Sequence, residues 1–172
     1  GIRHLLVTND FPPKVGGIQS YLWELWRRLD PERTTVLTTP YAGADDFDAE
    51  QPFRIERDAG RVLLPVPAVR RRIDQLALEV DADLVLIDPA WPLGYLGPDL
   101  ERPYGVVLHG AEVTIPGRLP TTRPFLRRAL DRSVLAVAAG GYPSLEARRA
   151  VGRSIPEGQI PPGADVHRVV PL

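Results

Sequence analysis

The chain has 172 residues, of which 44% are hydrophobic and 25% charged, and its formal net charge is −1. This length is enough to bury a core, so we expect one domain over residues 1–172. The near-neutral charge argues against a general nucleic-acid-binding protein. Without cysteine, disulfides and thiolate metal sites are excluded. No apolar run approaches the roughly 20 residues of a membrane span, so we expect a cytoplasmic protein.

The N-terminal segment predicts a strand, a glycine loop and a helix in succession. Residues 4–8 have the composition of a buried parallel strand, and apolar residues recur at helical spacing over residues 18–29. Gly16 and Gly17 lie at the junction, where free helical N–H groups and missing Cβ atoms favour a phosphate. The only lysine of the chain, Lys14, lies in the same loop. These features predict that the loop binds an anion. A Gly-Gly pair can also simply form a tight turn between strand and helix, and both interpretations stay open at this point.

Further along the chain, apolar runs typical of strands alternate with helical patterns. Strands are predicted at residues 34–38, 62–66, 84–87, 104–108 and 134–138. Helices are predicted around residues 69–80 and 125–130, each with an apolar face, and residues 41–50 have the acidic composition of a surface loop. This alternation predicts an α/β fold with a doubly wound, mostly parallel, Rossmann-like sheet. Ligands of such sheets bind outside the carboxyl ends of the strands.

His109 directly follows a predicted strand, so we expect it at the same sheet edge as the glycine loop. An imidazole there can donate to a sugar hydroxyl or a phosphate oxygen. A single histidine after a strand is also a common structural feature, and both interpretations stay open at this point. Glu112, three residues later, either caps a helix or orients the loop. The remaining candidates for loop or acceptor contacts are Asn9, Asp10 and Lys14.

The glycine loop does not match the common nucleotide-binding motifs. It lacks the G-x-G-x-x-G spacing of dinucleotide-binding proteins, and the chain contains no G-x-x-x-x-G-K-[ST] loop. The G-x-S-x-G motif of α/β-hydrolases is also missing from the sequence. Dehydrogenases, P-loop kinases and hydrolases of this type therefore lose support. The three histidines are too far apart in sequence to suggest a zinc site.

Two of the predicted helices carry many arginines. Arg70, Arg71 and Arg72 lie at the start of one, and four more lie between residues 123 and 132. A charged helix face is commonly just solvated. A basic helix can also bind an anionic lipid surface, where each cation contributes about 1 kcal/mol. We therefore treat Arg70, Arg71 and Arg72 as candidate membrane contacts.

Three segments together resemble the retaining glycosyltransferases of the GT-B fold, family 4. They are TNDFPPKVGGIQSYL at residues 8–22, HGAEV at residues 109–113 and PGADVHR at residues 162–168. Their order and spacing are those of the N-terminal half of these enzymes. Within the family, the chain is similar to actinobacterial GDP-mannose-dependent phosphatidylinositol monomannoside mannosyltransferases. The third segment departs from the family pattern at Pro162 and Ala164.

The resemblance implies transfer of a hexose, expected to be mannose from GDP-mannose, to a phosphatidylinositol-mannoside-like lipid with retention of configuration. It implies that the backbone at Gly16 and Gly17 faces the donor diphosphate, that His109 lies beside the transferred sugar, and that no metal is needed. The donor nucleotide would bind a second, C-terminal domain, so this half would be inactive by itself. The enzyme would act peripherally on the inner face of the plasma membrane. The alternative is a non-catalytic acceptor-binding or membrane-docking module.

Overall fold

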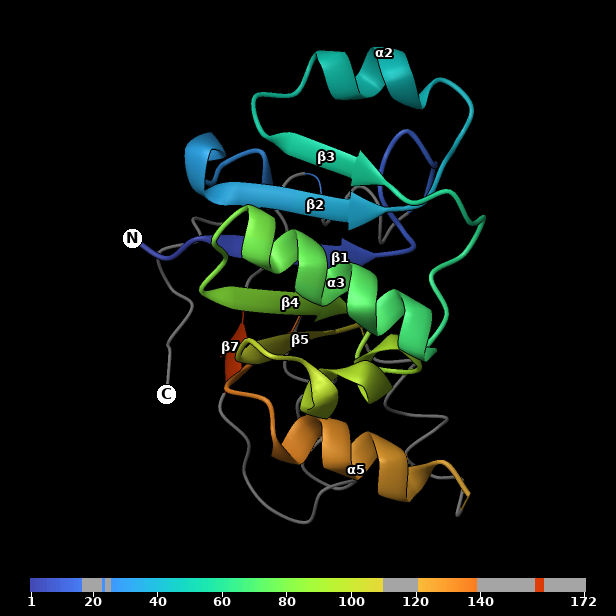
Figure 1. Ribbon diagram of the computed structural model, residues 1–172, viewed down its shortest axis with the longest axis vertical. Helices are drawn as coiled ribbons and strands as arrows, with labels where there is room; N and C mark the ends of the chain where they lie inside the picture. The colour runs from blue at the N-terminus through green and yellow to red at the C-terminus, as the bar shows by residue number, and fades with distance from the viewer. Residues whose placement is uncertain (17–22, 24–25, 110–120, 139–156, 160–172) are drawn as a thin grey trace.

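A computed structural model describes residues 1–16, 23, 26–109, 121–138 and 157–159. Its strands are β1 (His4–Thr8), β2 (Thr34–Thr38), β3 (Arg54–Arg57), β4 (Leu84–Asp88), β5 (Tyr104–Leu108), β6 (Leu135–Ala138) and β7 (Glu157–Gln159). In the described part of the chain they form one sheet in the order β3-β2-β1-β4-β5-β6-β7, and every neighbouring pair is parallel (Figure 1). This confirms the predicted Rossmann-like sheet.

Helical segments connect the strands. They are the 3-10 helices η1 (Pro31–Arg33) and η2 (Leu93–Asp99) and the α-helices α2 (Ala44–Ala49), α3 (Pro67–Glu79) and α5 (Arg123–Asp131). Figure 1 shows α3, η2 and α5 on one face of the sheet, and α2 beyond the edge strand β3. Of the helix predicted over residues 18–29, the structure describes only part, in which Trp23 and Trp26 are helical.

Both faces of the sheet are buried. Leu5 of β1 joins the core beneath α3, where it is grouped with Ile73, and both side chains are fully buried. The next residue, Leu6, belongs to the opposite core together with Trp26. Because both faces are covered, the central strands β1, β4 and β5 each contain a run of apolar residues, as parallel strands of this class usually do. The ends of the strands are therefore the part of the sheet that a ligand can contact.

Residues 62–66 do not form the predicted strand. That prediction is wrong: the strand that joins β2 is β3, which the sequence hides because its side chains are mostly charged. Residues 62–66 lie in the following loop. The side chain of Asn9 donates to the Leu63 carbonyl at 3.0 Å and accepts from the Leu63 N–H at 2.7 Å. The backbone polar groups of Leu63 are thus satisfied by a side chain and not by a neighbouring strand.

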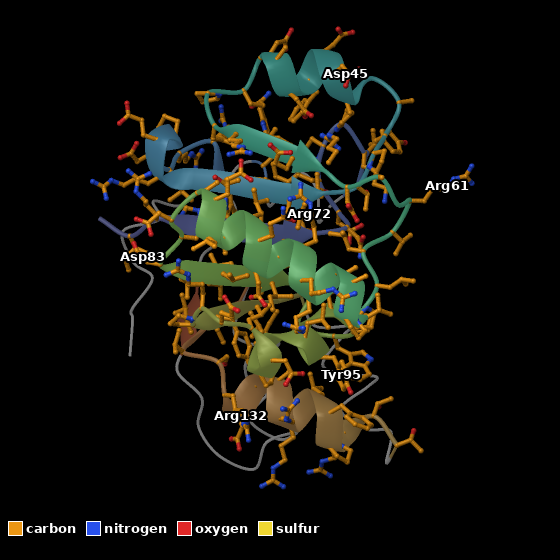
Figure 2. All side chains as sticks on the ribbon, viewed as in Figure 1. Asp45, Arg61, Arg72, Asp83, Tyr95 and Arg132 are labelled. Carbon is orange, nitrogen blue, oxygen red and sulfur yellow. The ribbon has the colours of Figure 1, made fainter. Side chains whose placement is uncertain are left out.

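The prediction of a loop over residues 41–50 is also wrong, because α2 lies within it. This helix has six residues and buries only Ala44, so no apolar stripe announces it. It begins after Gly43, whose φ of 80° suits a residue without a side chain. Asp45 and Asp46 occupy the first turn, where negative charge is favourable beside the helix dipole. Figure 2 shows Asp45 on this outer helix.

The two helices predicted around residues 69–80 and 125–130 are confirmed as α3 and α5. One member of the expected apolar face of α5 is misplaced, because Phe125 is 46% exposed. Its ring stacks on Trp91 at 6.4 Å between centroids and meets Tyr95 edge-on at 5.6 Å. Phe125 therefore covers the η2 segment from outside and does not enter the core.

Candidate functional site

Three strands bring polar side chains to the carboxyl edge of the sheet. Thr8 is the last residue of β1 and lies in register with Asp88, the last residue of β4. His109 follows the last residue of β5 directly. The chain passes from β1 outward to β2 and β3 before it returns to β4, so β1 and β4 flank the topological switch point. Open α/β sheets bind their ligands at this place.

Asp88 is the centre of this cluster and is fully buried. Its Oδ2 accepts a hydrogen bond of 2.7 Å from the Thr8 hydroxyl, and its Oδ1 is hydrogen-bonded to Nε2 of His109. Only 9% of the His109 side chain is exposed. A buried carboxylate is tolerated where hydrogen bonds replace its lost hydration, and both of its oxygens are paired here. The imidazole is consequently held in one orientation at the mouth of the sheet.

Asp10 adds a second carboxyl group to the cluster. Its backbone N–H donates to the Thr8 hydroxyl at 2.9 Å. Burial, and then the negative charge of Asp88, raise the pKa of Asp10 above its ordinary value, whereas Lys14 and His109 act in the opposite direction. Two acidic side chains and two basic ones thus face one another at the strand ends. Such a cluster offers donors and acceptors for a ligand rich in hydroxyl groups.

The loop that follows β1 is held from two sides. Lys14 Nζ donates to the backbone carbonyl of Asn9 at 3.1 Å. From β3, Arg57 donates to the Pro12 carbonyl at 2.8 Å, and it also pairs with both carboxylate oxygens of Asp48 at 2.9 and 2.8 Å. Asp48 belongs to α2, so the edge of the sheet and its outer helix together fix the loop. The described part of the loop is therefore held in place by contacts within the domain.

Most of the residues predicted from the sequence meet at this edge. Those that the structure places there are Asn9, Asp10, Lys14 and His109. Gly16 lies in the loop that follows β1. Gly17 and Glu112 lie outside the described residues.

Sequence reasoning missed three members of the site. They are Thr8, Asp88 and Arg57. Asp88 had a usable signal, because a carboxylate follows the apolar run Leu-Val-Leu-Ile and precedes a proline, at the end where ligands bind. Arg57 had none, since its partners are distant in sequence.

Arg70, Arg71 and Arg72 do not belong to this cluster, because they lie on α3. Arg70 pairs with Asp74 at 3.1 Å, and Arg72, labelled in Figure 2, lies 3.7 Å from a carboxylate oxygen of Glu56. Arg71 is exposed. The guanidinium groups of Arg70 and Arg72 thus have acidic neighbours within the domain.

Two further points concern the described residues alone. None of the helices there is long and apolar enough to cross a membrane. Among the same residues, no three His, Asp or Glu side chains are arranged so that they could hold a metal ion.

The chain has close relatives among curated proteins, although no family model matches it. The GDP-mannose-dependent alpha-(1-6)-phosphatidylinositol monomannoside mannosyltransferase of Mycobacterium tuberculosis is 36% identical over 179 residues, covering 98% of this chain and 46% of that protein. The protein of the same name from Mycolicibacterium smegmatis is 36% identical, with 97% and 46% covered. This chain is related to the N-terminal half of these mannosyltransferases. It spans about half the length of the curated relatives it matches.

Solved structures show the same half-length similarity in fold. Anabaena HepE in complex with UDP-glucose superposes with a TM-score of 0.70 at 17% identity, over 96% of this chain and 45% of HepE. Glycyrrhiza uralensis UGT73P12 superposes with a TM-score of 0.55 at 11% identity, over 94% and 49%. At these identities the likeness concerns the fold. The fold is that of one half of a GT-B glycosyltransferase, as the sequence resemblance implies.

Proposed function

We propose that this chain is the acceptor-side half of a retaining mannosyltransferase that moves mannose from GDP-mannose to a phosphatidylinositol-mannoside-like lipid. The observation that carries the proposal is the relationship to phosphatidylinositol monomannoside mannosyltransferases, which extends over 98% of the chain. The cluster at the carboxyl edge supports it. Carboxylate, imidazole and backbone N–H groups are suited to a polyhydroxylated ligand and a diphosphate.

In this proposal the groups at the edge have different tasks. The backbone N–H groups at Gly16 and Gly17 donate to the diphosphate as its negative charge grows in the transition state. In other enzymes, each preorganised donor of this kind contributes about 3 to 4 kcal/mol. His109 lies beside the transferred mannose. Asn9, with both ends of its amide bound to Leu63, keeps the loop open toward the acceptor. A second domain supplies the nucleotide site, and we expect transfer to proceed without a metal.

The direct test compares the 172-residue chain with the full-length protein that contains it. Each is incubated with radiolabelled GDP-mannose and a phosphatidylinositol-mannoside acceptor, with heat-inactivated protein as the control. We expect transfer by the full-length protein, also in the presence of EDTA, and none by the isolated chain, because it lacks the proposed nucleotide domain. Turnover by the isolated chain would contradict the half-enzyme proposal. Absence of transfer by the full-length protein, with UDP-sugars tried as well, would favour the non-catalytic module.

We also propose that Arg70, Arg71 and Arg72 dock the domain on anionic membrane, where its lipid acceptor resides. Cations near such a surface contribute about 1 kcal/mol each, so attachment is weak and is screened by salt. Changing all three arginines to glutamate should abolish co-sedimentation with vesicles that contain phosphatidylinositol. Wild-type binding should fall when the salt concentration is raised.

The matched control for this experiment reverses the same number of charges on another helix. Arg127, Arg128 and Arg132 lie on or directly after α5 and are changed to glutamate together. We expect this variant to bind vesicles nearly as the wild type does. Loss of binding in the α5 variant alone would move the docking surface to α5. Equal binding by all three proteins would show that the arginines are merely solvated.

A further inference from the structure

We propose that Asp88 is the positioning residue of His109 and fixes which nitrogen of the imidazole carries the proton. In this assignment Nε2 is protonated and donates to Asp88, while Nδ1 presents the lone pair of the neutral ring. The catalytic consequence rests on the proposed function, whereas the proton assignment depends only on the hydrogen bonds of this domain.

The Thr8 hydroxyl has one hydrogen and lies between two polar groups. Its oxygen accepts from the Asp10 N–H at 2.9 Å and lies 2.7 Å from Oδ2 of Asp88. A backbone N–H can only donate and an ionised carboxylate can only accept. The single hydroxyl hydrogen of Thr8 therefore points to Asp88. Oδ2 of Asp88 is thus occupied as an acceptor.

The other oxygen of Asp88 is hydrogen-bonded to the imidazole. Oδ1 faces Nε2 of His109, so the hydrogen between them belongs to one of the two groups. Imidazole is a stronger base than a carboxylate. The hydrogen therefore belongs to Nε2. Carboxylates that bind histidine in this way set its tautomer and its orientation.

The three side chains are carried by paired strands of one sheet. Asp88 ends β4 and His109 follows β5, and these strands are paired from Val85 to Ile87 with Tyr104 to Val106. Thr8 ends β1, which pairs with β4 on its other side. Three adjacent strands of one sheet thus set the positions of the three side chains. The orientation of the imidazole is determined by the sheet.

The proposal is tested first on the wild-type 172-residue chain by ¹⁵N NMR of the His109 ring. At a pH where the imidazole is neutral, we expect the Nε2–H tautomer. The Nδ1–H tautomer would overturn the proposal without any variant being made.

The variant Asp88→Asn gives a sharper test, because an amide has one acceptor end and one donor end. The Thr8 hydrogen requires the acceptor, so the amide NH₂ turns toward His109. Nε2 must then present a lone pair, and we expect the tautomer to invert to Nδ1–H. An unchanged tautomer in a folded Asp88→Asn protein would contradict the proposal.

The matched control removes the hydroxyl that directs the amide. Thr8→Val alone should leave the Nε2–H tautomer as it is. In Thr8→Val combined with Asp88→Asn, the amide oxygen is free to turn toward His109, and we expect the Nε2–H tautomer to return. A merely structural role of Asp88 predicts instead that the double variant keeps the tautomer of Asp88→Asn.

The activity measurement uses the full-length protein. Asp88→Asn should lower kcat by about 10- to 100-fold with little change in the KM for GDP-mannose, as expected when the partner of a functional histidine is lost. The double variant should recover part of this loss. Wild-type kcat in Asp88→Asn would overturn the positioning role. If the wild-type protein transfers no mannose, the proposed function fails, and the NMR result still decides the proton assignment.

Discussion

Replacing His109 with alanine in the full-length protein is expected to lower kcat for mannose transfer by about 100- to 1,000-fold, the loss typical of one preorganised polar group. His109 is hydrogen-bonded to buried Asp88 at the carboxyl edge of the sheet, where we place the transferred sugar. The affinity for GDP should hardly change, because the proposed nucleotide site belongs to the other half of the enzyme. Single-turnover kinetics and calorimetric titration with GDP measure the two quantities separately.

A conservative variant separates chemistry from folding. His109→Gln retains a side-chain N–H group that can donate to Asp88, so it should fold as the wild type does and still lose most of the activity. Thermal unfolding of both variants checks that the domain is intact. Wild-type kcat in His109→Ala would show that the histidine is only a structural residue at the end of β5.

The second large effect concerns stability. Changing Gly97 to alanine should lower the free energy of unfolding by about 1–3 kcal/mol or more, the usual cost of overpacking a core. A Cβ at this position would lie 2.3 Å from Cε2 of Tyr104. The ring cannot easily withdraw, because Tyr104 is buried and its hydroxyl donates to the Ala129 carbonyl. Urea unfolding of the 172-residue chain gives the measurement.

Gly94 provides the matched control in the same 3-10 helix. The nearest atoms to a Cβ at Gly94 are 3.8 Å away, which is ordinary van der Waals contact. Gly94→Ala should therefore leave stability unchanged or raise it by up to about 1 kcal/mol through the lower entropy of the unfolded chain. Equal destabilisation by both substitutions would mean that the clash with Tyr104 is not the cause.

Several elements of this protein follow from local sequence pattern. Residues 34–38 and 104–108 were predicted as strands with the bounds that β2 and β5 have. This works because parallel strands buried on both faces consist mainly of apolar and β-branched residues. The helix around residues 69–80 was likewise predictable from its spacing of apolar residues, and the position of His109 followed from the end of its strand.

Other features depend on partners that are distant in the chain and become visible only in the folded domain. Residues 62–66 look like a strand until Asn9, 54 positions away, is seen to bind Leu63. Asp88 becomes the centre of the site because Thr8, 80 positions earlier, and His109, 21 positions later, bind its two oxygens. The physical reason is that a hydrogen bond between two strand ends imposes no period on either segment. The parallel register of β1, β4 and β5 brings these side chains together.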